Sequence, residues 1–258
     1  MSEAAPIPIT AEIVQWRMKI FLRAPLRRKL LARTMRLLDK INGQEVLEMS
    51  GDDALSVAMQ NAGGGGGASW NSLAVSETQA ELLAEAGIPR IHLATLPQLP
   101  FEEGAFDAVV ASDVLEYVEK PAELMAELHR TMRSKTRLIL HVRRKRRTLV
   151  SIFRKWSGMT DPTRPMARLG FTPAELFDVL KDGFDVQETT GYGRFFTEFA
   201  NLLAELFAGV IPSACEPAAL NERRLRRAAA VYAPFAPVFW LAAILHLIFF
   251  FLPDHHKI

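Results

Sequence analysis

The stretch that decides the fold reads Leu99-Pro-Phe-Glu-Glu-Gly-Ala-Phe-Asp-Ala-Val-Val-Ala-Ser-Asp-Val-Leu-Glu-Tyr-Val118. A Leu-Pro-Phe turn and a short acidic loop lead into an apolar run over residues 106–111, which is typical of a buried strand. Asp113 and Glu116 follow at the expected end of that strand. Carboxylates in this position can serve acid-base chemistry, although more often they cap or solvate the next helix.

Outward from this stretch, short apolar strands alternate with helical segments. Strands are expected over residues 45–49, 69–75, 90–93, 106–111, 137–142 and 184–188. Helices are expected over residues 53–61, 77–86, 121–133 and 173–180. Because strands that alternate with helices form βαβ units, the sequence predicts an α/β domain with a mainly parallel sheet. We place this domain at residues 42–192, between a helical segment over 1–41 that Pro25 should interrupt and an apolar region over 193–258.

Composition excludes some kinds of site. The 258 residues include a single cysteine, Cys215, which excludes an internal disulfide and a cysteine-rich metal site. The histidines show no metal-ligand spacing, so no metal is expected. The N-terminus lacks an apolar core followed by a small-residue cleavage site, so no signal peptide is expected either.

Basic residues are concentrated in three blocks although the net charge is only +2. Residues 11–40 hold nine Lys or Arg against two acids, and residues 141–155 hold seven and no acid. The third block is Arg223, Arg224, Arg226 and Arg227. Such blocks usually face nucleic acid or an anionic membrane.

The C-terminal region is strongly apolar. Residues 195–211 carry apolar side chains at helical spacing, and residues 228–252 contain no Asp, Glu, Lys or Arg. That 25-residue stretch reaches the length of about 20 residues needed for a membrane span. Pro234 and Pro237 interrupt it, so an interfacial or re-entrant helix is the other interpretation. The sequence predicts membrane association, with a transmembrane helix somewhat favoured and the arginine block on the cytoplasmic side.

The quoted stretch resembles the turn and fourth strand of class I S-adenosylmethionine-dependent methyltransferases of the type 11 kind. Residues 121–132 resemble the next helix of that family, and Gly170-Phe-Thr-Pro-Ala-Glu-Leu176 resembles its late helix. The resemblance implies a Rossmann-like fold, with S-adenosylmethionine lying across the carboxyl ends of the strands. A glycine-rich turn after strand one, an acid after strand two and an acid after strand three would hold the cofactor.

The sequence departs from this family pattern at each of those places. In Glu48-Met-Ser-Gly-Asp-Asp-Ala54 the three expected glycine positions hold Ser50, Asp52 and Ala54. The acid expected after strand two maps to Ala74, and the acid after strand three maps to Thr95. If a cofactor is bound, the resemblance leaves these weak candidates for contacting it: Glu48, Gly51, Thr95 and Asp113. No catalytic residue is assigned.

These observations favour a membrane-associated protein whose cofactor site is eroded, an accessory or scaffold subunit of a membrane enzyme in lipid or envelope glycan metabolism. Its partners would be membrane lipids and either a membrane protein or a second copy of the chain. The residues expected to contact anionic lipid are Arg143, Arg144, Lys145, Arg146, Arg147, Arg223, Arg224, Arg226, Arg227 and Trp240. The alternative is an active methyltransferase for a lipid or lipid-linked substrate. A nucleic-acid-modifying enzyme is the least favoured hypothesis.

Overall fold

The computed structural model describes residues 9–38, 45–63, 68–145, 168, 170–190, 195–208 and 221–248. Two N-terminal helices, α1 (Ala11–Arg23) and α2 (Pro25–Leu38), meet at the predicted break. The Thr10 side chain caps α1, and Pro25 opens α2, where the missing N–H costs no helical hydrogen bond.

The described strands form one parallel sheet in the order β3-β2-β1-β4-β5. The strands are β1 (Glu45–Ser50), β2 (Ser69–Ala74), β3 (Ile91–Leu93), β4 (Phe106–Ser112) and β5 (Met132–His141). The order reverses between β1 and β4. The predicted Rossmann-like α/β fold is therefore confirmed, and its carboxyl edge beside β1 and β4 is where doubly wound folds bind ligands.

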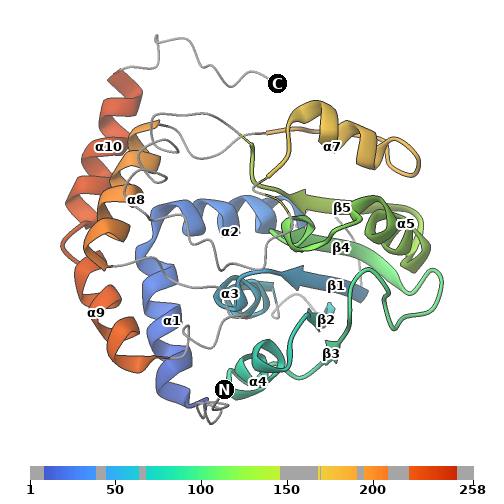
Figure 1. Cartoon of the computed structure of the whole chain (residues 1–258), viewed down its shortest axis with the longest axis horizontal. Coiled ribbons are helices and arrows are strands. Elements are labelled where there is room, and N and C mark those ends of the chain that lie inside the picture. The colour runs from blue at the N-terminus through green and yellow to red at the C-terminus, as the bar shows by residue number, and fades with distance from the viewer. Residues whose placement is uncertain are drawn as a thin grey trace, which may run out of the picture.

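Helices cover both faces of the sheet (Figure 1). The helices α3 (Asp53–Gly63) and α4 (Glu77–Glu85) lie on one face together with α1 and α2. The opposite face is covered by α5 (Pro121–Thr131) and α7 (Pro173–Leu180). A short 3-10 turn, η2 (Leu115–Tyr117), connects β4 to α5.

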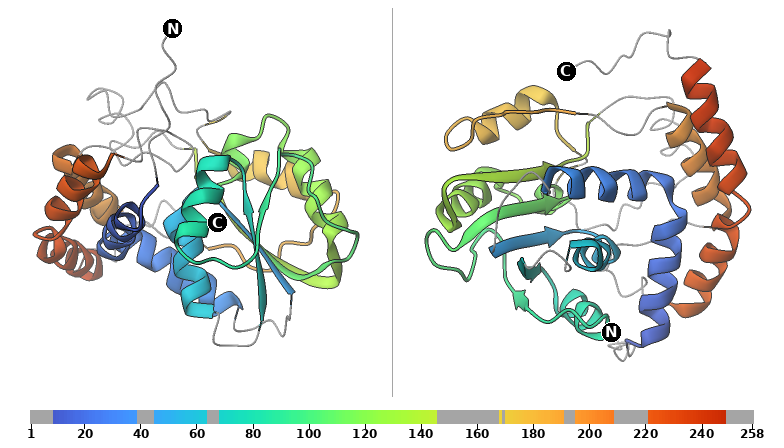
Figure 2. Two further views of the ribbon diagram at one scale, coloured as in Figure 1. Left: turned by 90° about the horizontal axis from the view of Figure 1, so that it is seen from below. Right: turned by 180° about the vertical axis from the view of Figure 1, so that it is seen from behind.

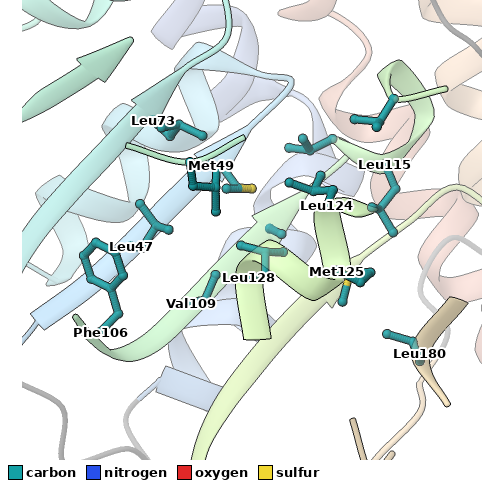
Figure 3. Packing of buried hydrophobic residues seen from close by; sticks show 14 of the residues in the cluster. Leu47, Met49, Leu73, Phe106, Val109, Leu115, Leu124, Met125, Leu128 and Leu180 are labelled. Atoms are coloured by element: carbon teal, nitrogen blue, oxygen red, sulfur yellow. The ribbon is translucent and has the colours of Figure 1, made fainter. Parts of the chain in front are cut away.

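The sheet contributes alternate side chains to two cores. Leu47, Met49 and Val109 pack against Leu124 and Leu128 of α5 (Figure 3). The next residue along each strand points to the opposite face, where apolar side chains of the β1 and β4 strands meet α2 and α3. This alternation follows from the two-residue period of a strand and explains why β1 and β4 carry apolar residues on both faces.

A second layer of helices packs outside α1. It consists of α8 (Phe195–Ala208), α9 (Glu222–Tyr232) and α10 (Ala236–Ile248), which line one side of the molecule (Figures 1 and 2). Their shared core includes Ile13 and Ile20 from α1, Ala204 from α8, Ala229 from α9 and Phe239 from α10. Part of the apolar C-terminal region is therefore used to cover the N-terminal helices.

Two sequence predictions are wrong. The strand expected over residues 184–188 is irregular chain without a sheet partner. The stretch 228–252 is divided by a turn at residues 233–235, and α10 is 13 residues long, or about 20 Å against a hydrocarbon thickness of about 30 Å. Within the described ranges, none of the helices combines the length and apolarity that a bilayer crossing requires. Residues 249–252 lie outside these ranges.

Candidate functional site

The turn after β1 is packed against the loop after β4. The Gly51 N–H donates a hydrogen bond to the Ser112 carbonyl over 2.9 Å. A Cβ atom on Gly51 would lie 2.6 Å from the Asp113 carbonyl oxygen and 3.0 Å from the Tyr117 ring. Glycine is needed here because two backbone segments of the protein meet, and a ligand is not required to explain it.

The two carboxylates of this turn are engaged within the protein. Asp52 caps α3, since one of its side-chain oxygens accepts from the Ala54 N–H over 3.2 Å. The other oxygen lies 2.7 Å from the Arg27 guanidinium of α2. The N-terminal helices therefore supply a cation to the turn that follows β1.

Asp53 forms a second ion pair, which is deeply buried. The Arg17 Nε atom of α1 donates to Asp53 Oδ2 over 2.7 Å, and Arg17 Nη2 donates to Oδ1. The two side chains are only 4% and 6% exposed. A bidentate pair of this kind fixes α1 against the start of α3, and removal of either partner would leave a buried charge.

Glu48 points away from the carboxyl edge and toward α3. Its two oxygens accept from the Ser56 hydroxyl over 2.8 Å and from the Ser72 hydroxyl over 3.0 Å. Burial raises the pKa of Glu48 to about 7, and the two hydroxyl donors only partly oppose this. The side chain is completely buried, so its visible role is to join β1, β2 and α3.

The ends of β1 and β2 are joined by Gln79 of α4. Its side-chain nitrogen donates to the Ser50 carbonyl over 2.7 Å, and its side-chain oxygen accepts from the Val75 N–H over 3.0 Å. The side chain is fully buried. Ala74, the position that corresponds to the missing family acid, is buried beside it, whereas Thr95 after β3 is exposed.

The other half of the carboxyl edge, beside β4 and β5, is different. Asp113 has φ 51°, a left-handed conformation in which aspartate is one of the more frequent residues. Its carboxylate lies 3.2 Å from His141 Nδ1 and 3.6 Å from Arg143 Nε. Burial alone would raise the pKa of Asp113, but the contact with His141 and the nearby guanidinium of Arg143 outweigh burial and lower that pKa to about 2. An acid held ionised beside an imidazole is an arrangement that can orient a general base.

Glu116 lies next to this pair. One of its oxygens accepts from the Arg143 N–H over 2.5 Å, while the other, Oε2, is buried and has no hydrogen-bond partner within the described ranges. Burial, together with the nearby Asp113 charge, raises the pKa of Glu116. Asp113, Glu116 and His141 therefore form the titratable cluster of this half of the edge.

The structure brings only part of the predicted site together. Gly51 and Asp113 touch each other, but Glu48 lies below the edge and Thr95 lies on a separate exposed loop. Among the predicted lipid contacts, the described basic side chains and the indole are exposed; they are Arg143, Arg144, Lys145, Arg223, Arg224, Arg226, Arg227 and Trp240. Arg146 and Arg147 lie outside the described residues, as does most of the glycine run 63–67.

The sequence did not indicate which residues form contacts within the protein at this edge of the sheet. Arg17, Arg27 and Gln79 lie 25 or more positions from their partners, and a basic or amidic side chain carries no signal of a distant partner. The pairing of His141 with Asp113 had a usable signal, because both residues end adjacent parallel strands.

The fold and site can be compared with known proteins. A family model described as a methyltransferase domain matches residues 61–140. This match confirms the resemblance to class I S-adenosylmethionine-dependent methyltransferases. Comparison with curated protein sequences gave no match.

Solved structures share the fold at low sequence identity. A putative sarcosine dimethylglycine methyltransferase from Galdieria sulphuraria is 12% identical, with a TM-score of 0.51 over 81% of this chain and 79% of its own. The YcgJ protein from Bacillus subtilis is 13% identical, with a TM-score of 0.47 over 59% of this chain and 66% of its own. Geranyl diphosphate C-methyltransferase from Streptomyces coelicolor is 15% identical, with a TM-score of 0.43 over 59% of each chain. At these identities the likeness extends to the fold alone.

Proposed function

We propose that this chain, whose residues 61–140 match the methyltransferase domain family, uses the fold as a scaffold and does not carry out methyl transfer. In this proposal it is an accessory subunit of a membrane enzyme, with its α/β domain on the cytoplasmic side. Lipid or envelope glycan metabolism remains the proposed setting.

The observation that carries the proposal is the state of the turn after β1. The positions at which the family approaches its cofactor closely are occupied by side chains that bind other parts of this protein. Asp52, at one of these positions, pairs with Arg27. Next to the turn, Asp53 pairs with Arg17, and Gln79 joins the β1 and β2 ends. The residues present therefore do not fit S-adenosylmethionine as the family holds it.

The free energy of the missing cofactor contacts also disfavours binding. A hydrogen bond to a charged group contributes roughly 1.5–3 kcal/mol, so the absence of two carboxylate contacts at Ala74 and Thr95 would weaken affinity by about a hundredfold or more.

The accessory role is tested by purification from membranes in mild detergent. The proposal predicts that one membrane enzyme co-purifies in a fixed ratio and loses activity when this chain is deleted. Restoring the chain with Asp113→Asn should rescue that activity fully. If rescue instead requires Asp113 and the purified chain transfers methyl groups, the scaffold role is wrong.

A second candidate function is an active methyltransferase, and the Asp113–His141 pair favours it. These side chains lie at the carboxyl ends of the adjacent strands β4 and β5, and Asp113 would hold the His141 imidazole so that its other nitrogen could accept a proton from a substrate. In that case the turn after β1 would have to open. Asp113→Asn and His141→Gln would each lower methyl transfer to a lipid acceptor at least about a hundredfold, the lower range for losing a general base.

A further inference from the structure

The outer helical layer has an unusual surface. On α8 the residues Phe199, Leu206 and Phe207 lie on one face, since they are spaced by seven and eight positions. Their side chains are 45%, 47% and 58% exposed. The adjoining side of α8, which includes Ala200, Ala204 and Ala208, is buried against the other helices. An exposed helix face normally carries polar residues, so the apolar face of α8 needs an explanation.

The neighbouring helix has the same property. α10 packs beside α8, with Phe239 and Ala242 buried in the shared core. Its outward face carries Val238, Trp240 and Leu241, which are 38%, 70% and 52% exposed. The described part of α10 contains no charged residue. We call these six exposed residues on α8 and α10 the apolar face.

The charges next to this surface indicate what covers it. α9 precedes α10 and lies in line with it along the same side of the molecule (Figures 1 and 2). Leu225, Ala228 and Ala229 of α9 are buried, while its four arginines are exposed. A row of arginines beside an apolar surface with an exposed tryptophan is typical of a protein that inserts into the interface of an anionic bilayer.

We infer that the apolar face of α8 and α10 inserts into one leaflet of an anionic bilayer while the α9 arginines contact its headgroups. The helices, of 13 and 14 residues, are about 20 Å long, which suits partial insertion. This inference deepens the proposed membrane location and does not depend on the loss of cofactor binding. It explains why a region too short to cross the bilayer is so apolar on its outside.

The test compares two matched variants of the full chain. Phe207→Glu changes the apolar face, and Phe177→Glu changes a side chain of similar exposure, 61% against 58%, on α7 away from that face. Binding is measured by flotation with vesicles of phosphatidylcholine alone or with 30% phosphatidylglycerol, a composition of roughly physiological charge. We expect the wild type to bind the anionic vesicles, Phe207→Glu to bind at least about tenfold more weakly, and Phe177→Glu to bind normally.

A second pair of variants tests how much the α9 arginines contribute to vesicle binding. Arg223→Gln with Arg227→Gln should reduce binding to anionic vesicles by about thirtyfold, at roughly 1 kcal/mol per charge, and should weaken its salt dependence. Lys135→Gln with Arg137→Gln, two exposed cations on β5, should change neither. Circular dichroism and the thermal midpoint establish that each variant is folded.

A second measurement introduces no charge into the apolar face. Lipids brominated on their acyl chains should quench the wild-type tryptophan fluorescence, and most of that quenching should disappear in Trp240→Phe. Equal binding by Phe207→Glu and Phe177→Glu would overturn the assignment of this face while leaving the membrane location standing. Absence of binding to any vesicle would overturn both. A wild-type dimer that Phe207→Glu converts to a monomer, without an effect on vesicles, would make the face a self-association surface and contradict the inference.

Discussion

The two halves of the sheet's carboxyl edge differ in how their polar groups are used. Beside β1 and β2, ionic and amide groups bind one another in pairs that join α1, α2, α3 and α4. Beside β4 and β5, Asp113, Glu116 and His141 gather in one place, and a buried oxygen of Glu116 lacks a partner within the described ranges. The polar groups beside β1 are thus engaged in contacts within the protein, whereas those beside β4 and β5 form a titratable cluster.

This difference indicates which contacts the fold needs and which it can lose. The glycine-rich turn can be replaced because a helix start can be capped by its own acids and by cations from neighbouring helices. The apolar residues of β1 and β4 are needed because each of them packs in one of the two cores. Four substitutions test how much the contacts beside β1 contribute to the free energy of unfolding.

The largest expected effect comes from Asp53→Ala. It leaves the Arg17 guanidinium buried without its bidentate acceptor, so we expect unfolding free energy to fall by about 3 kcal/mol or more. Urea denaturation measures the change. The double variant Asp53→Ala with Arg17→Met should recover part of the loss. A decrease below about 1 kcal/mol for the single variant would contradict the buried pair.

The second-largest effect is expected for Glu48→Gln, which should change how the free energy of unfolding depends on pH. In the folded state the pKa of Glu48 is about 7, above the ordinary value of 4.5 that applies when the chain unfolds. The folded protein therefore holds the proton more tightly, and wild-type stability is lost as pH rises from about 4.5 through 7. The loss is on the order of 2–3 kcal/mol.

Glu48→Gln should remove this decline, because the amide does not ionise. Urea denaturation at pH 5 and pH 8 measures the difference. Glu45→Gln, on the same strand but partly exposed, is the control and should keep the wild-type slope. Identical pH slopes for wild type and Glu48→Gln would rule out the raised pKa.

A smaller effect is expected for Gly51→Ala. The new Cβ would clash with the Asp113 carbonyl oxygen, and we expect a loss of about 2 kcal/mol in unfolding free energy from overpacking. Gly183→Ala is the control, since its nearest neighbour is the His129 side chain at 3.2 Å, which has room to shift. If both variants are equally stable, the two halves of the edge do not meet as closely as described.

The smallest effect is expected for Arg27→Gln. The guanidinium is 32% exposed, so its pair with Asp52 should contribute less than about 1 kcal/mol, and high salt should reduce that contribution further. Chemical denaturation in low and high salt measures it. A loss as large as that of Asp53→Ala would show that the two pairs are equally buried, contrary to the structure.

The fold could be predicted from the sequence because its signals are local. The break at Pro25, the alternation of strands and helices, and the helix opened by Thr172 and Pro173 all depend on neighbouring residues, and α7 does begin with a capping box. The expected strand at 184–188 failed because strand formation depends on a partner, and that segment has none. The expected span failed because the turn before α10 divides the apolar stretch.

The site could be predicted only in outline, because its contacts join residues that are far apart in the sequence. Ser50, Asp52 and Ala54 were visible in the sequence, but the residues that contact this turn and its neighbours come from α1, α2 and α4. Arg17 and Asp53 are 36 positions apart, and Gln79 and Ser50 are 29 apart. Such pairings arise from tertiary packing, which no local pattern encodes.

The account depends most on the claim that the β1 half of the edge is closed to the cofactor. Isothermal titration of the detergent-solubilised full chain with S-adenosylmethionine and S-adenosylhomocysteine tests this directly. The account predicts no heat of binding at millimolar ligand, for which the binding free energy would be weaker than about −4 kcal/mol. Micromolar, stoichiometric binding of either ligand would contradict it, because the polar groups beside β1 would then not exclude the cofactor.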